Sequence, residues 1–493
     1  MPLTPRPAAR RLLLTLLAGV LAAGGLLAVT GGGAEGGREP LPVPRADCGK
    51  GSRPETDIQG RVPASDYASG RVDSGYRCNA RAVSHRGTSG GFKVHRFTDA
   101  KGHTCAFYDS TLVFPRDLVY NVRSGLGVIV LAMDDPKRPR QTATLVTPAM
   151  QSPHESLLLN RRRGLLVASL GTAATYPGVL DVYDVKSDCR RPKLLSSTPS
   201  GVLGHESGFA PDGRTFWTAS TSGTLVAIDL ADPRLPTPVM VQPGVGYHGL
   251  RFSADGDTMY AANIGNPDLA ALDLMGGTGL DILDVSAVHD RVVGAMPTLL
   301  SKLTWPEASI PQSAEPFTQD GHDYLLEMDE YADLFSLKGA SDQPDAPVGA
   351  GRIINVDDPR HPFVVSHLRL EAHQPEVHGG EQYTDPGANF PAQGYAGHYC
   401  SVPKRTDPKI AGCSMILSGL RLFDISDVEH PREVAYFNRP QRPGSRPSFP
   451  DVAGSYAMSA PAWDPKRGSV WYTDANSGFY DVKLTNGIAK LLR

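Results

Sequence analysis

The sequence predicts an all-β protein, a seven-bladed β-propeller with a disulfide-pinned N-terminal extension. Three observations predict it: a repeated strand motif, short apolar runs bounded by turn residues, and an even number of cysteines. Glycine (52 residues) and proline (42 residues) are spread along the 493-residue chain at turn positions. That distribution is typical of many short strands joined by turns and not of a disordered chain.

One motif recurs along the chain: a glycine, an apolar run of strand length, then usually Asp or Asn. It begins at Gly127, Gly178, Gly223, Gly279, Gly351, Gly419 and Gly478. Aligning the copies places at one position Ala132, Asp184, Asp229, Asp284, Asn355, Asp424 and Asp481. Steps of 45 to 71 residues separate these positions. Such steps fit one four-stranded blade plus loop insertions, so seven copies predict seven blades.

The strands of each blade are predicted from local chemistry. The run from Leu225 to Ile228 is too short for a helix and is bounded by Gly223 and by Asp232-Pro233. Proline ends the ladder because it has no N–H to donate, and the Asp before it is expected to cap a turn. Asp-Gly pairs such as Asp212-Gly213 indicate a hairpin upstream. Each blade is therefore expected to contain an inner strand, a middle strand, the glycine-led strand and an outer strand.

These residues resemble the LVIVD-repeat family of secreted bacterial β-propellers. The resemblance rests on Gly223-TLVAIDLADP, Gly279-LDILDVS and Gly419-LRLFDISD, and extends over roughly residues 111 to 487. It implies export and a propeller fold without a defined reaction. The Asp-Gly turns are also similar to those of lactonase-type and YVTN or WD40-like propellers, which keeps an enzymatic function open. Ala132 departs from the motif, and the seventh copy lacks Asp-Pro.

Three regions are predicted along the chain. Residues 1–34 are expected to be a signal peptide, because basic residues precede an apolar run at 12–29 and small residues at 31–34. The run is also close to the length of a membrane span, so an uncleaved N-terminal anchor is the alternative. Residues 35–110 lack the repeat and are expected to be a cysteine-containing extension. Residues 111–493 are expected to form the propeller, with long insertions at 333–350 and 379–418.

The six cysteines are expected to form disulfides, as is typical of an exported chain with an even count. They are Cys48, Cys78, Cys105, Cys189, Cys400 and Cys413. The absence of CxxC spacing excludes a zinc ribbon and a thioredoxin-like site. Cys400 and Cys413 are the closest in sequence and are predicted to pair. The other four allow three pairings, of which Cys48–Cys78 with Cys105–Cys189 is favoured.

The charge balance excludes an electrostatic reason for binding nucleic acid. The chain has 49 Lys+Arg and 52 Asp+Glu, a net charge of -3. The expected partner is an extracellular ligand or protein, and membrane contact is expected only through an uncleaved N-terminal segment. No phosphate-binding glycine loop, G-x-S-x-G elbow or HExxH motif occurs in the sequence.

Candidate chemistry is predicted at the start of the inner strands, which line the central channel of a propeller. Three units begin this strand with histidine: His154, His205 and His248. His205 and His248 each precede the Asp of the following turn by seven residues, so they hold equivalent blade positions. Further polar residues expected in the same ring are Glu155, Glu206, Glu315 and His398.

Imidazoles together with carboxylates are ligands of divalent Zn, Cu, Ni or Fe, so this ring is a candidate transition-metal site. The alternative is a hydrated channel mouth whose side chains bond only water and backbone. Asp329-Glu330, at the end of a middle strand, is a further acidic pair that either binds a cation or is solvated.

Several functions are compatible with these features. The first hypothesis is a non-catalytic exported propeller that binds a ligand or partner at its channel mouth. The second is a metal-dependent enzyme, either a lactonase-like hydrolase or an oxidoreductase. A purely structural surface protein is the third. The fold alone does not choose among them, because propellers host both binding and catalysis.

Overall fold

A computed structural model describes residues 40–110, 127–169, 178–199, 204–220, 223–265, 278–305, 310–330, 350–378, 380–388, 394–442 and 453–493. The predicted signal peptide or anchor lies outside the described residues, as does nearly all of the insertion at 333–350. Among the described residues, no helix has the length and apolar character that crossing a membrane requires.

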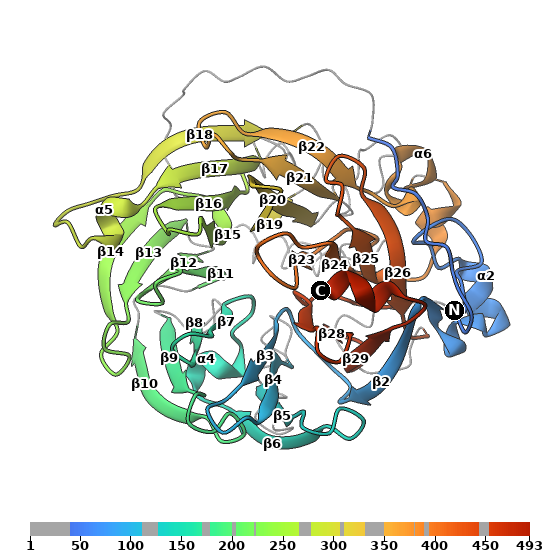
Figure 1. Ribbon diagram of the computed structural model, residues 1–493, viewed down its shortest axis with the longest axis horizontal. Coiled ribbons are helices and arrows are strands. Elements are labelled where there is room, and N and C mark those ends of the chain that lie inside the picture. Colours follow the sequence, from blue (N-terminus) through green and yellow to red (C-terminus); the bar gives the residue numbers. More distant parts are fainter. Residues whose placement is uncertain are drawn as a thin grey trace, which may run out of the picture.

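Seven antiparallel sheets stand around one axis, which confirms the predicted seven-bladed propeller (Figure 1). In the first five blades, whose strands are consecutive in sequence, the first strand lies nearest the axis and the last lies at the rim (Figure 1). Each small sheet buries its faces by packing against its two neighbours, so the ring is stabilised as a unit.

The strands of the first four blades follow one another in sequence. The first blade contains β3 (Val94–Thr98), β4 (Thr104–Asp109), β5 (Val128–Ala132) and β6 (Arg140–Leu145). The second contains β7 (Leu157–Asn160), β8 (Leu165–Ser169), β9 (Val179–Asp184) and β10 (Lys193–Pro199). The third contains β11 (Glu206–Phe209), β12 (Thr215–Ser220), β13 (Thr224–Asp229) and β14 (Thr237–Pro243). The fourth contains β15 (Tyr247–Phe252), β16 (Thr258–Asn263), β17 (Gly279–Asp284) and β18 (Thr298–Thr304).

The fifth blade resembles the first four, whereas the sixth and seventh combine strands from both ends of the chain. The fifth blade still contains consecutive strands, β19 (Ile310–Gln319), β20 (His322–Glu330), β21 (Gly351–Asn355) and β22 (Phe363–Leu368). The sixth contains β23 (Tyr399–Ser401), β24 (Ile410–Met415), β25 (Gly419–Asp424) and β26 (Arg432–Asn438), with β1 (Tyr76–Cys78) added at the rim. The seventh contains β27 (Ala462–Asp464), β28 (Ser469–Asp474) and β29 (Gly478–Leu484), with β2 (Ala80–Arg86) as its outer strand.

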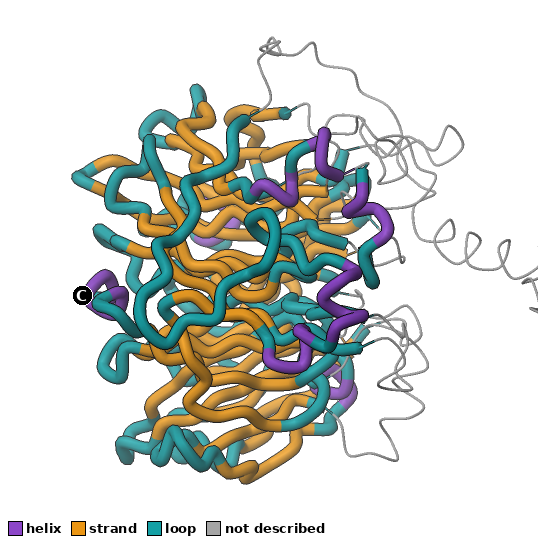
Figure 2. Tube along the Cα trace, turned by 90° about the vertical axis from the view of Figure 1, so that its right-hand side faces the viewer, coloured by secondary structure: helices purple, strands orange, loops and turns teal. Residues whose placement is uncertain are grey.

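The helical segments are short and lie in the connections. They are α2 (Ala64–Ser69), η1 (Arg71–Ser74), α4 (Pro148–Gln151), α5 (Ser286–His289), η3 (Glu371–His373), α6 (Pro375–His378), η4 (Glu381–Thr384) and η5 (Ile488–Leu492). Figure 2 shows several of them along one face of the ring, with the C-terminus on the opposite face.

The ring closes through the N-terminal strand β2, which pairs with β29 from Ala80↔Leu484 to Arg86↔Phe479. The inner strands β3 and β4 of the first blade also precede residue 111. The predicted boundary between an extension at 35–110 and a propeller from 111 is therefore corrected. These strands were missed because they lie upstream of the first glycine-led strand, which is the only part of the blade that carries the motif.

Residues 40–75 form the extension proper and pack against the sixth blade (Figure 1). Arg421 of β25 is fully buried and forms ion pairs with Glu55 of the extension and, at 2.8 Å, with Glu433 of β26. Arg61 forms a second contact, with its Nε 2.8 Å from Asp385. Buried charges of this kind are stable only when they are paired, so these contacts hold the extension in one place.

All three predicted disulfides are present: Cys48–Cys78, Cys105–Cys189 and Cys400–Cys413. The first ties the extension to β1. The second links β4 of the first blade to the loop after β9 of the second. The third joins a directly opposed pair on β23 and β24.

The repeated Asp or Asn caps the turn after the glycine-led strand. Asp184 Oδ1 accepts the N–H of Lys186 at 2.8 Å, and Asp229 Oδ1 accepts that of Ala231 at 2.7 Å. Asp284, Asn355 and Asp424 likewise accept the backbone N–H of the residue two positions further along the chain. Ala132 occupies the position without a cap. Asp481 was aligned wrongly, because strand pairing puts Lys483 at the equivalent site opposite Ser469.

The core lies between neighbouring blades. Trp217, Trp471 and Tyr472 are fully buried, as expected for strand residues that pack against the adjacent sheet, and Trp463 is nearly so. This packing fixes the inner strands relative to one another, and their first residues therefore meet at a defined mouth of the channel.

Candidate metal centre

Four histidines lie at the start of inner strands, those of the second, third, fourth and sixth blades. His154 precedes β7, His205 precedes β11, His248 is the second residue of β15, and His398 precedes β23. Because inner strands run in the same direction around the axis, their first residues approach one another at one mouth. The structure therefore brings together residues that are up to 244 positions apart in sequence.

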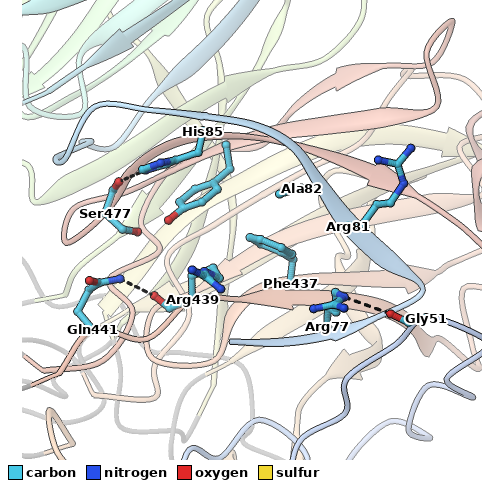
Figure 3. Close-up of a pocket in the computed structure, with 10 residues that line it drawn as sticks. Gly51, Arg77, Arg81, Ala82, His85, Phe437, Arg439, Gln441 and Ser477 are labelled. Carbon is cyan, nitrogen blue, oxygen red and sulfur yellow. Dashed lines mark hydrogen bonds between the residues drawn. The ribbon is translucent and has the colours of Figure 1, made fainter. Parts of the chain in front are cut away.

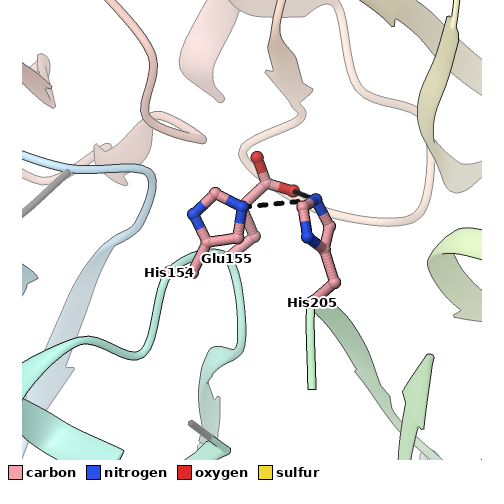
Figure 4. A group of neighbouring side chains, drawn as sticks. All are labelled: His154, Glu155 and His205. Carbon is pink, nitrogen blue, oxygen red and sulfur yellow. Dashed lines mark hydrogen bonds and ion pairs between the residues drawn. The ribbon is translucent and has the colours of Figure 1, made fainter. Parts of the chain in front are cut away.

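Glu155 lies among these imidazoles. Its Oε1 is 3.2 Å from His398 Nε2, and its Oε2 is 3.4 Å from His248 Nε2 and 3.9 Å from His205 Nε2. His154 Nε2 is in turn 3.2 Å from His205 Nε2 (Figure 4). The Tyr399 hydroxyl donates a hydrogen bond of 3.0 Å to Glu155 Oε2.

A second carboxylate comes from the end of β20. Glu330 Oε1 is 3.4 Å from His248 Nε2, and Glu330 Oε2 is 3.3 Å from His398 Nε2. Its neighbour Asp329 points elsewhere and pairs with Arg352 at 2.7 Å. The His/Glu cluster is defined by His154, Glu155, His205, His248, Glu330 and His398.

Two backbone carbonyls fix the orientation of two of the rings. The Nδ1–H of His248 donates to Gln312 O at 3.2 Å, and that of His398 donates to Met458 O at 2.7 Å. A histidine that uses Nδ1–H in this way presents Nε2 to the other side, which is the usual arrangement of a metal ligand. Here both Nε2 atoms face the same two carboxylates.

The backbone at His154 is strained. Its φ is 49°, in the left-handed region that a side chain with a Cβ seldom adopts. The Phe92 ring packs edge-on against this imidazole at 4.5 Å between centroids and also lies 5.3 Å from His398. Strain of this kind persists where the surroundings hold a side chain in a required position, and functional sites are common places for it.

Burial sets the protonation of the histidines. It lowers the pKa of His154 and His248, and it lowers the pKa of His205 to about 4. These three imidazoles are therefore neutral at pH 7. For His398 burial acts in the same direction, but hydrogen bonds to Glu155 and Glu330 outweigh it and raise the pKa to about 9.

The two carboxylates of the cluster differ. Burial disfavours the charged form of Glu155, but the surrounding histidines outweigh burial and hold the pKa of Glu155 well below the usual range; at pH 7 the protonated one is His398, which also hydrogen-bonds to this carboxylate. Burial raises the pKa of Glu330. His398 thus lies within 3.3 Å of two carboxyl groups whose pKa values are shifted in opposite directions.

Two of the residues expected in the ring lie outside the cluster. Glu206 forms ion pairs with Lys93 at 3.1 Å and with Arg251 at 3.0 Å. Glu315 pairs with the other side of Arg251, also at 3.0 Å. Both carboxylates are paired with cationic side chains of the inner strands, although Glu206 also lies close enough to His205 and His248 to favour their charged forms.

Comparison with solved structures finds similarity at low sequence identity. The β-propeller domain of Cps50 (Swd1) from Myceliophteria thermophila is similar to this chain with a TM-score of 0.49 and 12% identity, over 82% of this chain and 98% of that one. A chain of a mitotic checkpoint complex is similar with a TM-score of 0.47 and 11% identity, over 93% of this chain and 100% of that one. No protein-family model and no curated protein matches the sequence.

The spacing of the cluster fits a metal ion. A histidine nitrogen lies about 2.0–2.1 Å from a bound Zn²⁺, so neighbouring ligand atoms of a tetrahedral ion are roughly 3.3–3.5 Å apart. The separations between imidazole nitrogens and carboxylate oxygens are 3.2, 3.3, 3.4 and 3.9 Å. Two sets of three ligand atoms, each set within 4.8 Å, share Glu155: one with His154 and His205, the other with Glu330 and His398.

A third set of potential ligands, Asp99, His103 and Asp188, has a structural explanation. Asp99 accepts the backbone N–H groups of His103 and of Cys189, which positions the loop at the second disulfide. Asp188 is paired with Arg190 at 3.1 Å. These contacts already occupy the carboxylates, and they explain the group without a metal ion.

Proposed function

We propose that this protein is an exported, metal-binding β-propeller that holds a divalent transition-metal ion at one mouth of its channel. The ligands are drawn from the His/Glu cluster. The observation that carries the proposal is the placement of His248 Nε2 and His398 Nε2, each within 3.4 Å of both Glu155 and Glu330.

The physical reason is a conflict of lone pairs. With Nδ1–H committed to a carbonyl, a neutral His248 directs an electron pair at two carboxylate oxygens, and its buried Nε2 has no hydrogen-bond partner. Buried polar atoms are normally satisfied, and leaving one unpaired is costly. A metal cation between these atoms would satisfy all of them at once.

The donor set favours a transition metal over Ca²⁺ or Mg²⁺. Four imidazole nitrogens and two carboxylates match the preferences of Zn, Cu, Ni and Fe, whereas the hard cations prefer oxygen alone. Such an ion acts as a Lewis acid or, for Cu and Fe, as a redox centre. The protein would contribute the orientation of the ligands and the apolar wall that Phe92 provides.

Export is supported by two features. Three disulfides are typical of an oxidising compartment. The N-terminal basic and apolar segment has the pattern of a signal peptide. Membership of the LVIVD-repeat family is part of the same proposal, and the partner would be an extracellular ligand or protein.

A catalytic use of the ion is the second candidate. It is favoured by His205, whose side chain is 21% exposed while those of His398 and Glu155 are 0% and 2% exposed. An approach to the ion from the His205 side would let a substrate or water reach it. A lactonase-like hydrolase or an oxidoreductase would need such an approach, whereas a purely structural ion would not.

The test is metal analysis of protein purified without chelator. We expect about one transition-metal ion per chain, with nitrogen and oxygen ligands at about 2.0–2.2 Å by X-ray absorption. The double substitution His205→Ala, His248→Ala should abolish binding. Glu155→Gln, which preserves the shape of the side chain, should weaken it by at least about tenfold.

Two controls separate the cluster from a general effect of mutation. His361→Ala removes an exposed histidine of the turn between β21 and β22, and Glu315→Gln removes a carboxylate that lies outside the cluster. Both should retain the metal. The proposal is wrong if wild-type protein neither contains nor takes up Zn²⁺, Cu²⁺, Ni²⁺ or Fe²⁺, or if Glu315→Gln loses as much metal as Glu155→Gln.

A further inference from the structure

A separate cavity lies away from the channel, where the ring closes. Its volume is about 630 Å³, and it lies between β1 and β26 of the sixth blade and β2 and β29 of the seventh (Figure 3). Its lining includes Arg77, Arg81, His85, Phe437, Arg439 and Tyr480. None of its ten lining residues is acidic.

Three guanidinium groups in this cavity have no carboxylate partner in the described part of the chain. Arg77 uses its Nε to donate to Gly51 O at 3.1 Å, and no ion pair forms with Arg77, Arg81 or Arg439. The nearby Arg442, by contrast, is neutralised by Asp73 at 2.7 Å. The cavity therefore gathers positive charge that the protein itself does not balance.

The floor of the cavity is aromatic. Phe437 and Tyr480 are buried, with ring centroids 5.5 Å apart. The His85 ring stacks on Tyr480 at 4.6 Å and its Nε2 lies 2.5 Å from Ser477 O. On its other side Tyr480 is covered by Tyr472, with ring centroids 5.3 Å apart, so His85 is the exposed ring of this wall. An exposed imidazole beside cationic groups forms a surface for a ligand that has both a flat or cyclic body and acidic substituents.

Size and chemistry together define the ligand class. Small-molecule sites usually have volumes of about 300–1,000 Å³ with a few convergent polar groups. Arginine binds carboxylate, phosphate and sulfate through paired N–H donors. We infer that this cavity binds a small cyclic polyanion, such as an acidic sugar, whose ring lies on the exposed His85 imidazole and whose acid groups contact the arginines.

The test is titration calorimetry with three probes: a sulfated uronic-acid disaccharide, the uncharged disaccharide maltose, and inorganic sulfate. The sulfated disaccharide should bind at least about tenfold more tightly than sulfate, because it adds ring contacts to the charge contacts. Maltose should not bind. The measurements use chelator-treated protein, so their outcome is independent of the metal site.

Substitutions locate the site. Arg81 is exposed on the outer strand β2, so Arg81→Gln should leave folding intact and weaken binding by at least about tenfold. Arg439→Gln provides a second test from the opposite wall. Arg140→Gln is the matched control, an exposed arginine on the outer strand of the first blade, and it should bind as the wild type does.

The inference is overturned if the disaccharide does not bind at millimolar concentration. It is also overturned if maltose binds equally well, since the charge would then be irrelevant, or if sulfate alone binds as tightly, since the rings would then contribute nothing. Equal weakening by Arg140→Gln and Arg81→Gln would indicate nonspecific attraction and would likewise contradict it.

Discussion

At the scale of single residues, Glu155 contacts four other side chains at the channel mouth. Its carboxylate faces three imidazoles and accepts a hydrogen bond from Tyr399. It follows a histidine whose backbone is in the left-handed region. This local conformation puts two adjacent side chains, His154 and Glu155, into the same site, which an extended strand would send to opposite faces.

Another histidine, His95, links two blades and should make stability depend on pH. Its Nε2–H donates to Leu157 O at 2.8 Å, and burial lowers its pKa to about 3, against about 6.5 in the unfolded chain. Between these values the unfolded chain binds the extra proton. The contribution of His95 is therefore complete above pH 6.5 and is lost as the pH falls toward 3.

This dependence can be measured by urea unfolding of chelator-treated protein at pH 7.5, 5.5 and 4.5. Replacement by the non-titrating donor in His95→Gln should reduce the loss of unfolding free energy between pH 7.5 and 4.5. Because other groups titrate in both proteins, the quantity compared is the difference between variant and wild type. An identical pH dependence in the two proteins would refute the assignment.

At the scale of the elements, the sequence motif has a physical meaning. Its glycine is the first residue of the third strand or immediately precedes it, and in most blades its Asp ends that strand by accepting the N–H two residues further along. The motif was detectable because this turn needs a side-chain acceptor at a constant position. In the seventh copy Lys483 occupies the position of the capping Asp. The alignment by sequence instead selects Asp481, which lies two residues earlier on the same strand.

The capping role predicts a stability change. Asp184→Ala removes the acceptor for Lys186 N–H and for the Ser187 hydroxyl, and we expect a loss of about 1 kcal/mol in the free energy of unfolding. Asp184→Asn keeps one acceptor oxygen, as Asn355 does in the fifth blade, and should lose less. Urea unfolding of the three proteins side by side measures both effects. Equal losses in the two variants would show that charge, not the hydrogen bond, matters.

The candidate site was predictable only in part. The histidines could be located because His205 and His248 stand at the same distance from equivalent turns. Glu330 could not be placed among them, because it lies at the end of a middle strand and not at the start of an inner one. It reaches the mouth because β19 and β20 pair over nearly their full lengths, from Gln319↔His322 to Ile310↔Glu330. Conversely, Glu206 sat beside a histidine in sequence, but nothing in the sequence paired it with Lys93.

At the scale of the whole molecule, both ends of the chain stabilise the ring. The extension carries Glu55 to the buried Arg421, and the segment that follows it contributes β1 and β2 to two different blades. Strand order in the ring closure was not predictable from the repeat, since β2 has no glycine-led motif of its own. Its position follows instead from the need of the seventh blade for an outer strand.

The buried ion pairs of Arg421 should be essential for seating the extension. Arg421→Met leaves Glu55 and Glu433 buried without a counter-charge, and we expect a loss of about 3–5 kcal/mol. Urea unfolding and limited proteolysis of residues 40–75 measure it. Arg442→Met breaks the solvent-exposed pair with Asp73 and serves as the control, with stability close to that of the wild type. A mild effect of Arg421→Met would mean that the extension is held mainly by apolar contacts.

The pairing of β2 with β29 also has a consequence for biosynthesis. Ala80 meets Leu484, so roughly 400 residues must be polymerised between the two halves of this ladder, on the order of 20–80 s at usual translation rates. Throughout that interval the backbone N–H and C=O groups at the edge of β2 are unpaired and can pair with a strand of another nascent chain. Cys48 and Cys78 are both translated before β2, so their bond can form early, whereas the last blade waits for the final residues. A message truncated near its 3′ end would therefore yield a chain without β29, whose ring stays open and whose β2 keeps an unpaired edge.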